Sequence, residues 1–66
     1  MTSYLIKYQR RTGTVKVTAF DSFRKATSER LRLDRENDDP DTEIVAVASE
    51  SERHLRKSHS RYFSAV

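Results

Sequence analysis

The sequence predicts a single small α+β domain, in which a three-stranded, mainly antiparallel sheet packs with helices in two layers. Three observations support this class. The chain has 66 residues, enough for only one thin hydrophobic core, so the domain is expected to span 1–66. Two alternating, β-rich segments flank the only glycine. Segments with helical patterns then enclose a third β-rich run, which gives the order ββαβα. A right-handed crossover places the third strand beside the first, in the sheet order 2-1-3.

The first two strands are expected at about residues 3–10 and 14–20 and form a hairpin. Each has its apolar side chains at every second position, as in Tyr4, Ile6 and Tyr8, which places them on one face of a strand. The connection ends at Gly13, the residue type that accepts the positive φ needed in a short hairpin loop. Gly13 is therefore assigned a structural role.

The first helix is expected at about residues 22–36 and begins after Asp21 or Ser22, either of which can cap it. At 100° per residue, one broad face is expected to pack on the sheet. That face carries Phe23, Ala26, Thr27, Leu31 and Leu33. Phe23 is assigned a structural role on this basis. The opposite face carries charges of alternating sign, the usual pattern of a solvated helix surface.

An acidic stretch and an apolar strand follow. Residues 36–43 include five acidic side chains and no basic one. Their spacing does not match a calcium-binding loop, so we expect no calcium there. The third strand is expected at about residues 42–49, and Ile44 to Ala48 is apolar on both faces. Two explanations are open: a helix covers the second face of the sheet, or this strand is a contact surface.

The last helix is expected at about residues 50–62. Ser49 and Glu52 have the spacing of a capping box at its start. Leu55, Tyr62 and Phe63 share one face with His59 and are predicted to hold this helix on the sheet.

Composition excludes several functional classes. There is no cysteine, so disulfides and thiolate metal sites are excluded and a cytoplasmic location is favoured. The longest apolar run, Ile44 to Ala48, is too short to cross a membrane. His54 and His59 are five residues apart, which prevents both from facing one metal ion on a helix. There is no glycine-rich phosphate loop. We therefore expect no enzyme activity, no cofactor, no metal and no small-molecule substrate.

The charge distribution leaves two functional hypotheses. The net charge is +3, and the basic residues proposed to contact phosphate or a partner gather at the hairpin tip and on the last helix: Arg10, Arg11, Arg53, Arg56, Lys57 and Arg61. The first hypothesis is an interaction or regulatory module that binds a protein partner or itself. The alternative is weak nucleic-acid binding, largely independent of sequence, through these basic residues.

Three short motifs add a resemblance. Arg10-Arg11-Thr12-Gly13, the step Phe20-Asp21 and the stretch from His59 to Phe63 resemble small uncharacterised proteins of actinobacteria and their mobile elements. The resemblance implies a bacterial or phage source and a small standalone protein. It implies no activity and no functional residues.

Overall fold

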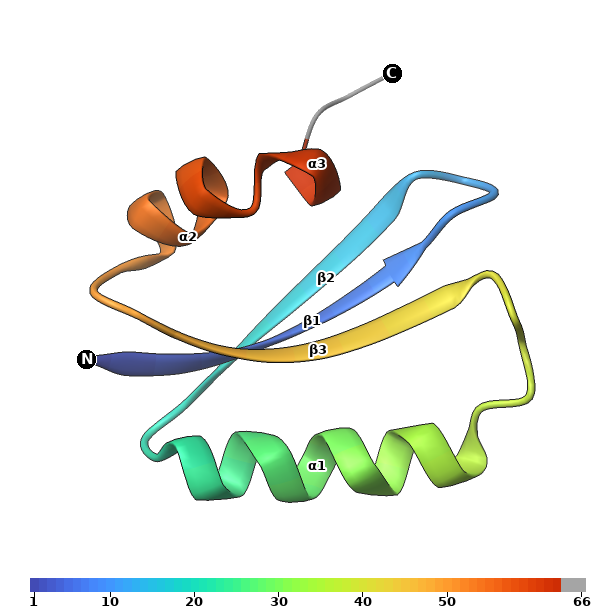
Figure 1. The fold of residues 1–66 in the computed structure, drawn as a ribbon, viewed down its shortest axis with the longest axis horizontal. Helices are drawn as coiled ribbons and strands as arrows, with labels where there is room; N and C mark the ends of the chain where they lie inside the picture. The colour runs from blue at the N-terminus through green and yellow to red at the C-terminus, as the bar shows by residue number, and fades with distance from the viewer. Residues whose placement is uncertain (64–66) are drawn as a thin grey trace.

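The structure, a computed structural model, describes residues 1–63 and has an antiparallel three-stranded sheet at its centre (Figure 1). In chain order the elements are β1 (Thr2–Gln9), β2 (Thr14–Phe20), α1 (Phe23–Glu36), β3 (Thr42–Ser49), α2 (Glu52–Ser58) and α3 (Ser60–Phe63). The central strand β1 is antiparallel to both neighbours, in the order β2-β1-β3. The predicted α+β class and strand order are confirmed.

The helices lie on opposite faces of the sheet (Figure 1). α1 covers one face, and α2 and α3 cover the other, so the molecule has three layers where two were predicted. The reason is that both faces of the sheet carry apolar side chains: Leu5 and Ile44 lie on one face, and Tyr4 and Ile6 on the other. Each set is stabilised only if it is removed from water. Coverage of the second face therefore accounts for much of the apolar character of β3.

The larger part of the core lies between the sheet and the C-terminal helices. Leu55 of α2 and Tyr62 of α3 are buried with Tyr4 and Ile6 of β1. The ring of Tyr62 meets that of Tyr8 edge to face, with centroids 5.3 Å apart. Phe63 is only half-buried at the margin of this cluster, so it contributes less packing than its two neighbours in the predicted set.

The α1 helix packs on the sheet through a narrower stripe than predicted. Ser22 caps it by accepting a hydrogen bond from the Lys25 amide at 3.1 Å. Ala26 is fully buried, whereas Phe23 is 50% exposed and Leu31 is 57% exposed. Phe23 therefore lies outside the core, although the sequence predicts it on the face that packs on the sheet. A small side chain at the point of contact lets the helix approach closely, and larger residues on the flanks then extend past the sheet.

The end of the chain forms two short helices in place of one. His59 has φ −120° and ψ 45°, outside the helical region, and this residue separates α2 from α3. The N-cap of α2 is Ser51, whose hydroxyl accepts from the His54 amide at 3.2 Å. The Ser49 hydroxyl instead donates to the Ser51 carbonyl at 3.1 Å, so the predicted capping box of Ser49 and Glu52 is wrong. The break at His59 turns Tyr62 toward Tyr8.

The hairpin between β1 and β2 closes as the glycine predicts. Gly13 has φ +72°, and its amide donates to the Gln9 carbonyl at 2.8 Å. The loop between β1 and β2 lies at the same end of the molecule as the segment between α1 and β3 (Figure 1).

Candidate functional site

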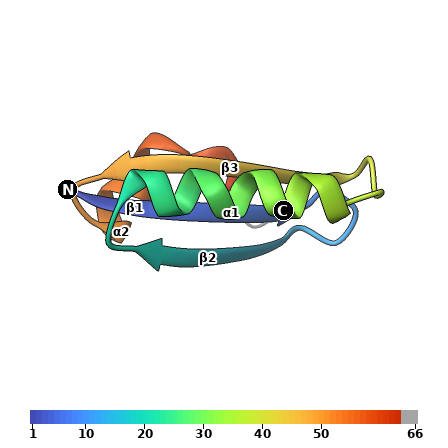
Figure 2. The same ribbon diagram turned by 90° about the horizontal axis from the view of Figure 1, so that it is seen from below.

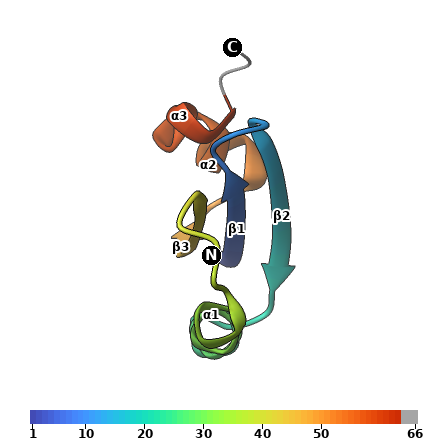
Figure 3. The ribbon, with the colours of Figure 1, turned by 90° about the vertical axis from the view of Figure 1, so that its right-hand side faces the viewer.

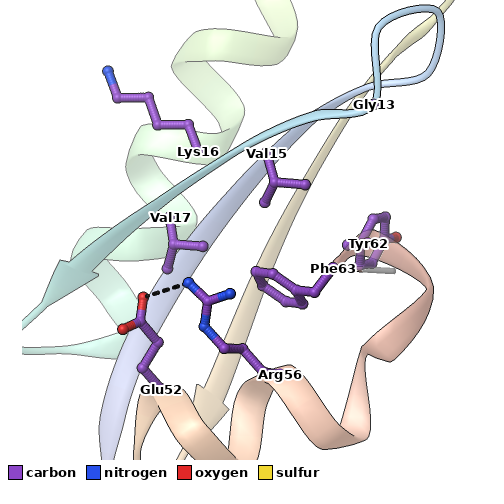
Figure 4. A pocket seen from close by; sticks show the side chains of 8 residues that line it. All are labelled: Gly13, Val15, Lys16, Val17, Glu52, Arg56, Tyr62 and Phe63. Atoms are coloured by element: carbon purple, nitrogen blue, oxygen red, sulfur yellow. Dashed lines mark ion pairs between the residues drawn. The ribbon is translucent and has the colours of Figure 1, made fainter. Parts of the chain in front are cut away.

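A groove of about 530 Å³ lies between β2 and the C-terminal helices (Figure 4). It exists because α2 and α3 sit over β1 and β3: Tyr62 packs on Tyr8 of β1, and Arg61 pairs with Glu43 of β3. The same face of the edge strand β2 is left half-covered. The residues that line the groove are Gly13, Val15, Lys16, Val17, Glu52, Arg56, Tyr62 and Phe63.

The groove combines a few apolar side chains with polar lining and one ion pair. Val15 and Val17 project from β2 to the side on which Phe63 lies (Figure 4). The Arg56 guanidinium lies 4.7 Å from the centre of the Phe63 ring, and its Nη2 is 3.7 Å from Glu52 Oε1. Lys16 points away from the groove. Glu52 and Arg56 pair with each other, so the groove offers a partner segment both an apolar patch and polar groups.

The basic residues at the hairpin end are paired within the molecule. Arg10 Nε lies 3.3 Å from Glu43 Oε2, and Arg61 Nη2 lies 2.9 Å from Glu43 Oε1. Arg11 lies between two aspartates, 3.3 Å from Asp41 and 3.9 Å from Asp39. The acidic stretch therefore supplies counter-charges for three of the residues predicted to contact phosphate.

Hydrogen bonds hold these carboxylates in the ionised form. The hydrogen bond from Arg10, supported by Arg61, lowers the pKa of Glu43. The pKa of Asp39 is lowered first by the Asp41 amide and then by the Gln9 side chain, whose Nε2 donates to Asp39 at 2.7 Å. A phosphate that approached Arg10 would have to compete with these carboxylates, which disfavours nucleic-acid binding at this end.

The structure does not gather the six predicted contact residues into one surface. Arg10, Arg11 and Arg61 meet around the acidic stretch, whereas Arg53, Arg56 and Lys57 lie along α2 (Figure 1). Arg56 is engaged by Glu52 and Phe63. Within residues 1–63, Arg53 and Lys57 are the members of this set that are exposed and make no ion pair.

The histidines make local contacts. His54 Nδ1 lies 2.9 Å from Glu50, and His59 Nδ1 lies 2.9 Å from the Ser58 hydroxyl while its ring stacks on Tyr62. Over the part of the chain that the structure describes, no group of three or more acidic or histidine side chains could hold a metal ion. No helix in the same residues has the length and apolar character needed to cross a membrane.

The groove was not predicted from the sequence. The available signal was the order 2-1-3, which makes β2 an edge strand, combined with the alternation of Val15 and Val17 on the face opposite Lys16. Locating the groove also requires the positions of α2 and α3, which depend on the break at His59.

Comparisons with protein-family models, curated proteins and solved structures find no match to this chain. A functional assignment must therefore be argued from the chemistry of its own surface.

Proposed function

We propose that this protein is a non-enzymatic interaction module that binds a protein partner through the groove beside β2. One observation carries the proposal: Val15, Val17 and Phe63 form a partly exposed apolar surface directly beside an open sheet edge. An edge strand has backbone N–H and C=O groups without a neighbouring strand. A partner segment that pairs with β2 can place alternate side chains in the groove. We propose a bacterial or phage-encoded cytoplasmic role, in line with the resemblance and the lack of cysteine.

The surface chemistry also indicates the kind of segment. Alternation along β2 places apolar side chains in the groove at every second position, so the partner strand needs the same alternation. Lys16 lies in the middle of the exposed edge, and the chain carries a net charge of +3. Acidic side chains flanking the apolar positions of the partner would speed its approach and pair with Lys16. We therefore propose an extended, alternating apolar segment with acidic flanks as the ligand.

Val17→Glu tests this proposal, because it replaces an apolar side chain of the groove with a charged one. Ser28→Glu is the control: it adds the same charge at an exposed position of α1, on the other face of the sheet. In quantitative affinity capture from the native cell, the wild type and Ser28→Glu should recover the same partner, and Val17→Glu should lose it. Circular dichroism checks that each variant is folded. If Val17→Glu does not fold, Val15→Glu takes its place in the experiment. Equal recovery of the partner by folded groove and control variants would contradict the proposal.

The alternative function is weak nucleic-acid binding through α2. It is supported by Arg53 and Lys57, which are exposed and make no ion pair among the described residues. Two phosphate contacts predict a log–log salt slope of about −2, and affinity for an arbitrary duplex or single strand should fall in Arg53→Glu. The absence of measurable binding at about 50 mM salt, where such contacts are strongest, would leave only the protein-partner proposal.

A further inference from the structure

Two lysines of the hairpin face each other on the α1 side of the sheet. Lys7 of β1 and Lys16 of β2 are directly opposite partners in the antiparallel register. Both side chains are exposed, and neither forms an ion pair within residues 1–63. Like charges at directly opposite positions destabilise a sheet. The fold therefore holds two positive charges together without a negative charge to balance them.

The carboxylates of α1 do not supply the missing negative charge. Glu29 and Arg32 line a depression of about 170 Å³ together with the two lysines. Arg32 pairs with both Glu29 and Glu36, and its Nη1 lies 2.6 Å from Glu36 Oε2. The other charges on and beside α1 are two ion pairs, Asp21–Lys25 and Arg30–Asp34, and two exposed arginines without an ion pair among the described residues, Arg24 and Arg35. The unbalanced charge on this side of the sheet is therefore entirely positive.

The outer edge of β2, beside these lysines, is open to a partner strand. α1 packs mainly on β1 and β3 and leaves β2 at its side (Figure 2). Seen from the side, no other element of residues 1–63 lies beyond β2 (Figure 3). The Gly13 amide donates to the Gln9 carbonyl, so the backbone groups of Gln9 face β2. Alternation along the antiparallel ladder then directs the backbone groups of Val15, Val17 and Ala19 to the open edge.

A strand added to this edge presents its side chains alternately to the two sides of the sheet. Side chains opposite Val15 and Val17 enter the groove, on the side away from α1. The residue between them lies opposite Lys16, which points away from the groove (Figure 4). In an antiparallel strand this is a non-hydrogen-bonded pair, in which the Cα atoms are only about 4.5 Å apart and the side chains are closest. A carboxylate at this position is therefore well placed to balance the two lysines.

We propose that the partner segment carries one acidic residue between two apolar residues, and that this acidic side chain pairs with Lys16 on the α1 side of the sheet, next to Lys7. The inference rests on the function proposed above and fixes the register of the partner strand. Its apolar residues lie opposite Val15 and Val17, and its acidic residue lies opposite Lys16. A shift by one residue places the acidic side chain in the groove and an apolar one against the lysines. Alternation and charge therefore select the same register.

Nuclear magnetic resonance titration of the full chain with two capped peptides, Thr-Val-Glu-Val-Thr and Thr-Val-Gln-Val-Thr, tests this register. The titration extends to about 5 mM peptide, because a short strand buries little surface and binds weakly. The wild type should bind the glutamate peptide about two- to fivefold more tightly, as expected for one cross-strand ion pair. The amide signals of Val15 and Val17, which face the open edge, should shift most. The preference should decrease at about 0.5 M salt, because Lys16 is exposed.

Lys16→Gln removes the charge that the proposal depends on and should bind the two peptides equally. It also removes the opposition of like charges across the hairpin, so the variant is expected to fold. Lys57→Gln is the matched control. It makes the same change of charge at an exposed residue of α2 that has no ion pair among the described residues, and it should keep the wild-type preference.

Equal affinities of the wild type for both peptides, with shifts that disappear in Val17→Glu, would overturn the proposed register and leave the groove as a binding site. A glutamate preference that persists in Lys16→Gln would overturn it too, because the charge responsible would lie elsewhere. The absence of any shift with either peptide would overturn both this register and the function proposed for the groove. A DNA duplex that binds the wild type and Lys57→Gln but not Lys16→Gln would assign the lysines to phosphate and overturn the acidic partner residue.

Discussion

The Leu55 side chain provides the most deeply buried contact between α2 and the sheet. It is fully buried and packs with Tyr4 and Ile6. Leu55→Ala should lower the free energy of unfolding by about 3 kcal/mol, because a cavity remains after the side chain is removed. Phe63→Ala should cost only about 1–2 kcal/mol, because that ring is only partly buried, at the margin of the core. Urea unfolding monitored by circular dichroism measures both values, and a larger loss in Phe63→Ala would contradict this ranking.

Single residues differ in how far the sequence can predict their roles. Gly13 and Ser22 were predictable because a positive φ and a helix cap depend only on near neighbours in the chain. Phe23 was not, because its burial depends on how far α1 is rotated about its own axis against the sheet. Ala26 sets that rotation, and apolar periodicity alone does not distinguish the buried alanine from the exposed phenylalanine.

Among the elements, α2 depends most on its cap, because its seven residues are too few for an isolated helix. Ser51→Ala removes the acceptor of the His54 amide and should lower the free energy of unfolding by about 1 kcal/mol. Ser51→Asp keeps a hydrogen-bond acceptor at this position and should retain most of the stability that Ser51→Ala loses. Urea unfolding measures the free energy of unfolding of each variant. Amide hydrogen exchange then shows whether the loss of protection is confined to α2. Equal stabilities of the alanine and aspartate variants would show that Ser51 does not cap this helix.

The strands were easier to predict than the last helix. Alternation and a single glycine locate β1 and β2 within a residue or two of their observed bounds. The division of the last helix at His59 has no comparable local signal, since histidine is an ordinary residue within helices. Tertiary contacts favour the break because it allows Tyr62 to pack on Tyr8 while Leu55 remains buried.

At the scale of the whole molecule, the strand order could be predicted from the sequence. Which charged side chains form ion pairs within the fold could not. The crossover rule gives the order 2-1-3 from the element order alone. The acidic and basic stretches suggest a bipolar molecule when read along the chain. In the fold the acidic stretch lies against the hairpin and pairs with Arg10, Arg11 and Arg61. Three of the predicted phosphate contacts are therefore internal ion pairs, and the groove becomes the better candidate site.

These internal pairs make the stability of the whole molecule depend on pH. The lowered pKa values of Asp39 and Glu43 mean that both groups stabilise the fold when ionised. This contribution is fully present above their unfolded pKa values, about 3.9 and 4.3, and is lost as pH falls through the lower folded values. The thermal midpoint should therefore change little between about pH 7 and pH 5 and should decrease below about pH 4.

The variant Asp39→Asn/Glu43→Gln tests whether these two carboxylates cause that decrease. At neutral pH it should melt below the wild type, because Arg10 and Arg61 lose their charged partner and Arg11 keeps only Asp41. As the pH approaches 3, the two melting temperatures should converge, since protonation removes the same charges from the wild type. Asp38→Asn is the matched control, because Asp38 is exposed and makes no ion pair among the described residues, and it should follow the wild-type curve. If the melting temperatures of the double variant and the wild type stay equally far apart at every pH, other ionisable groups cause the loss of stability in acid.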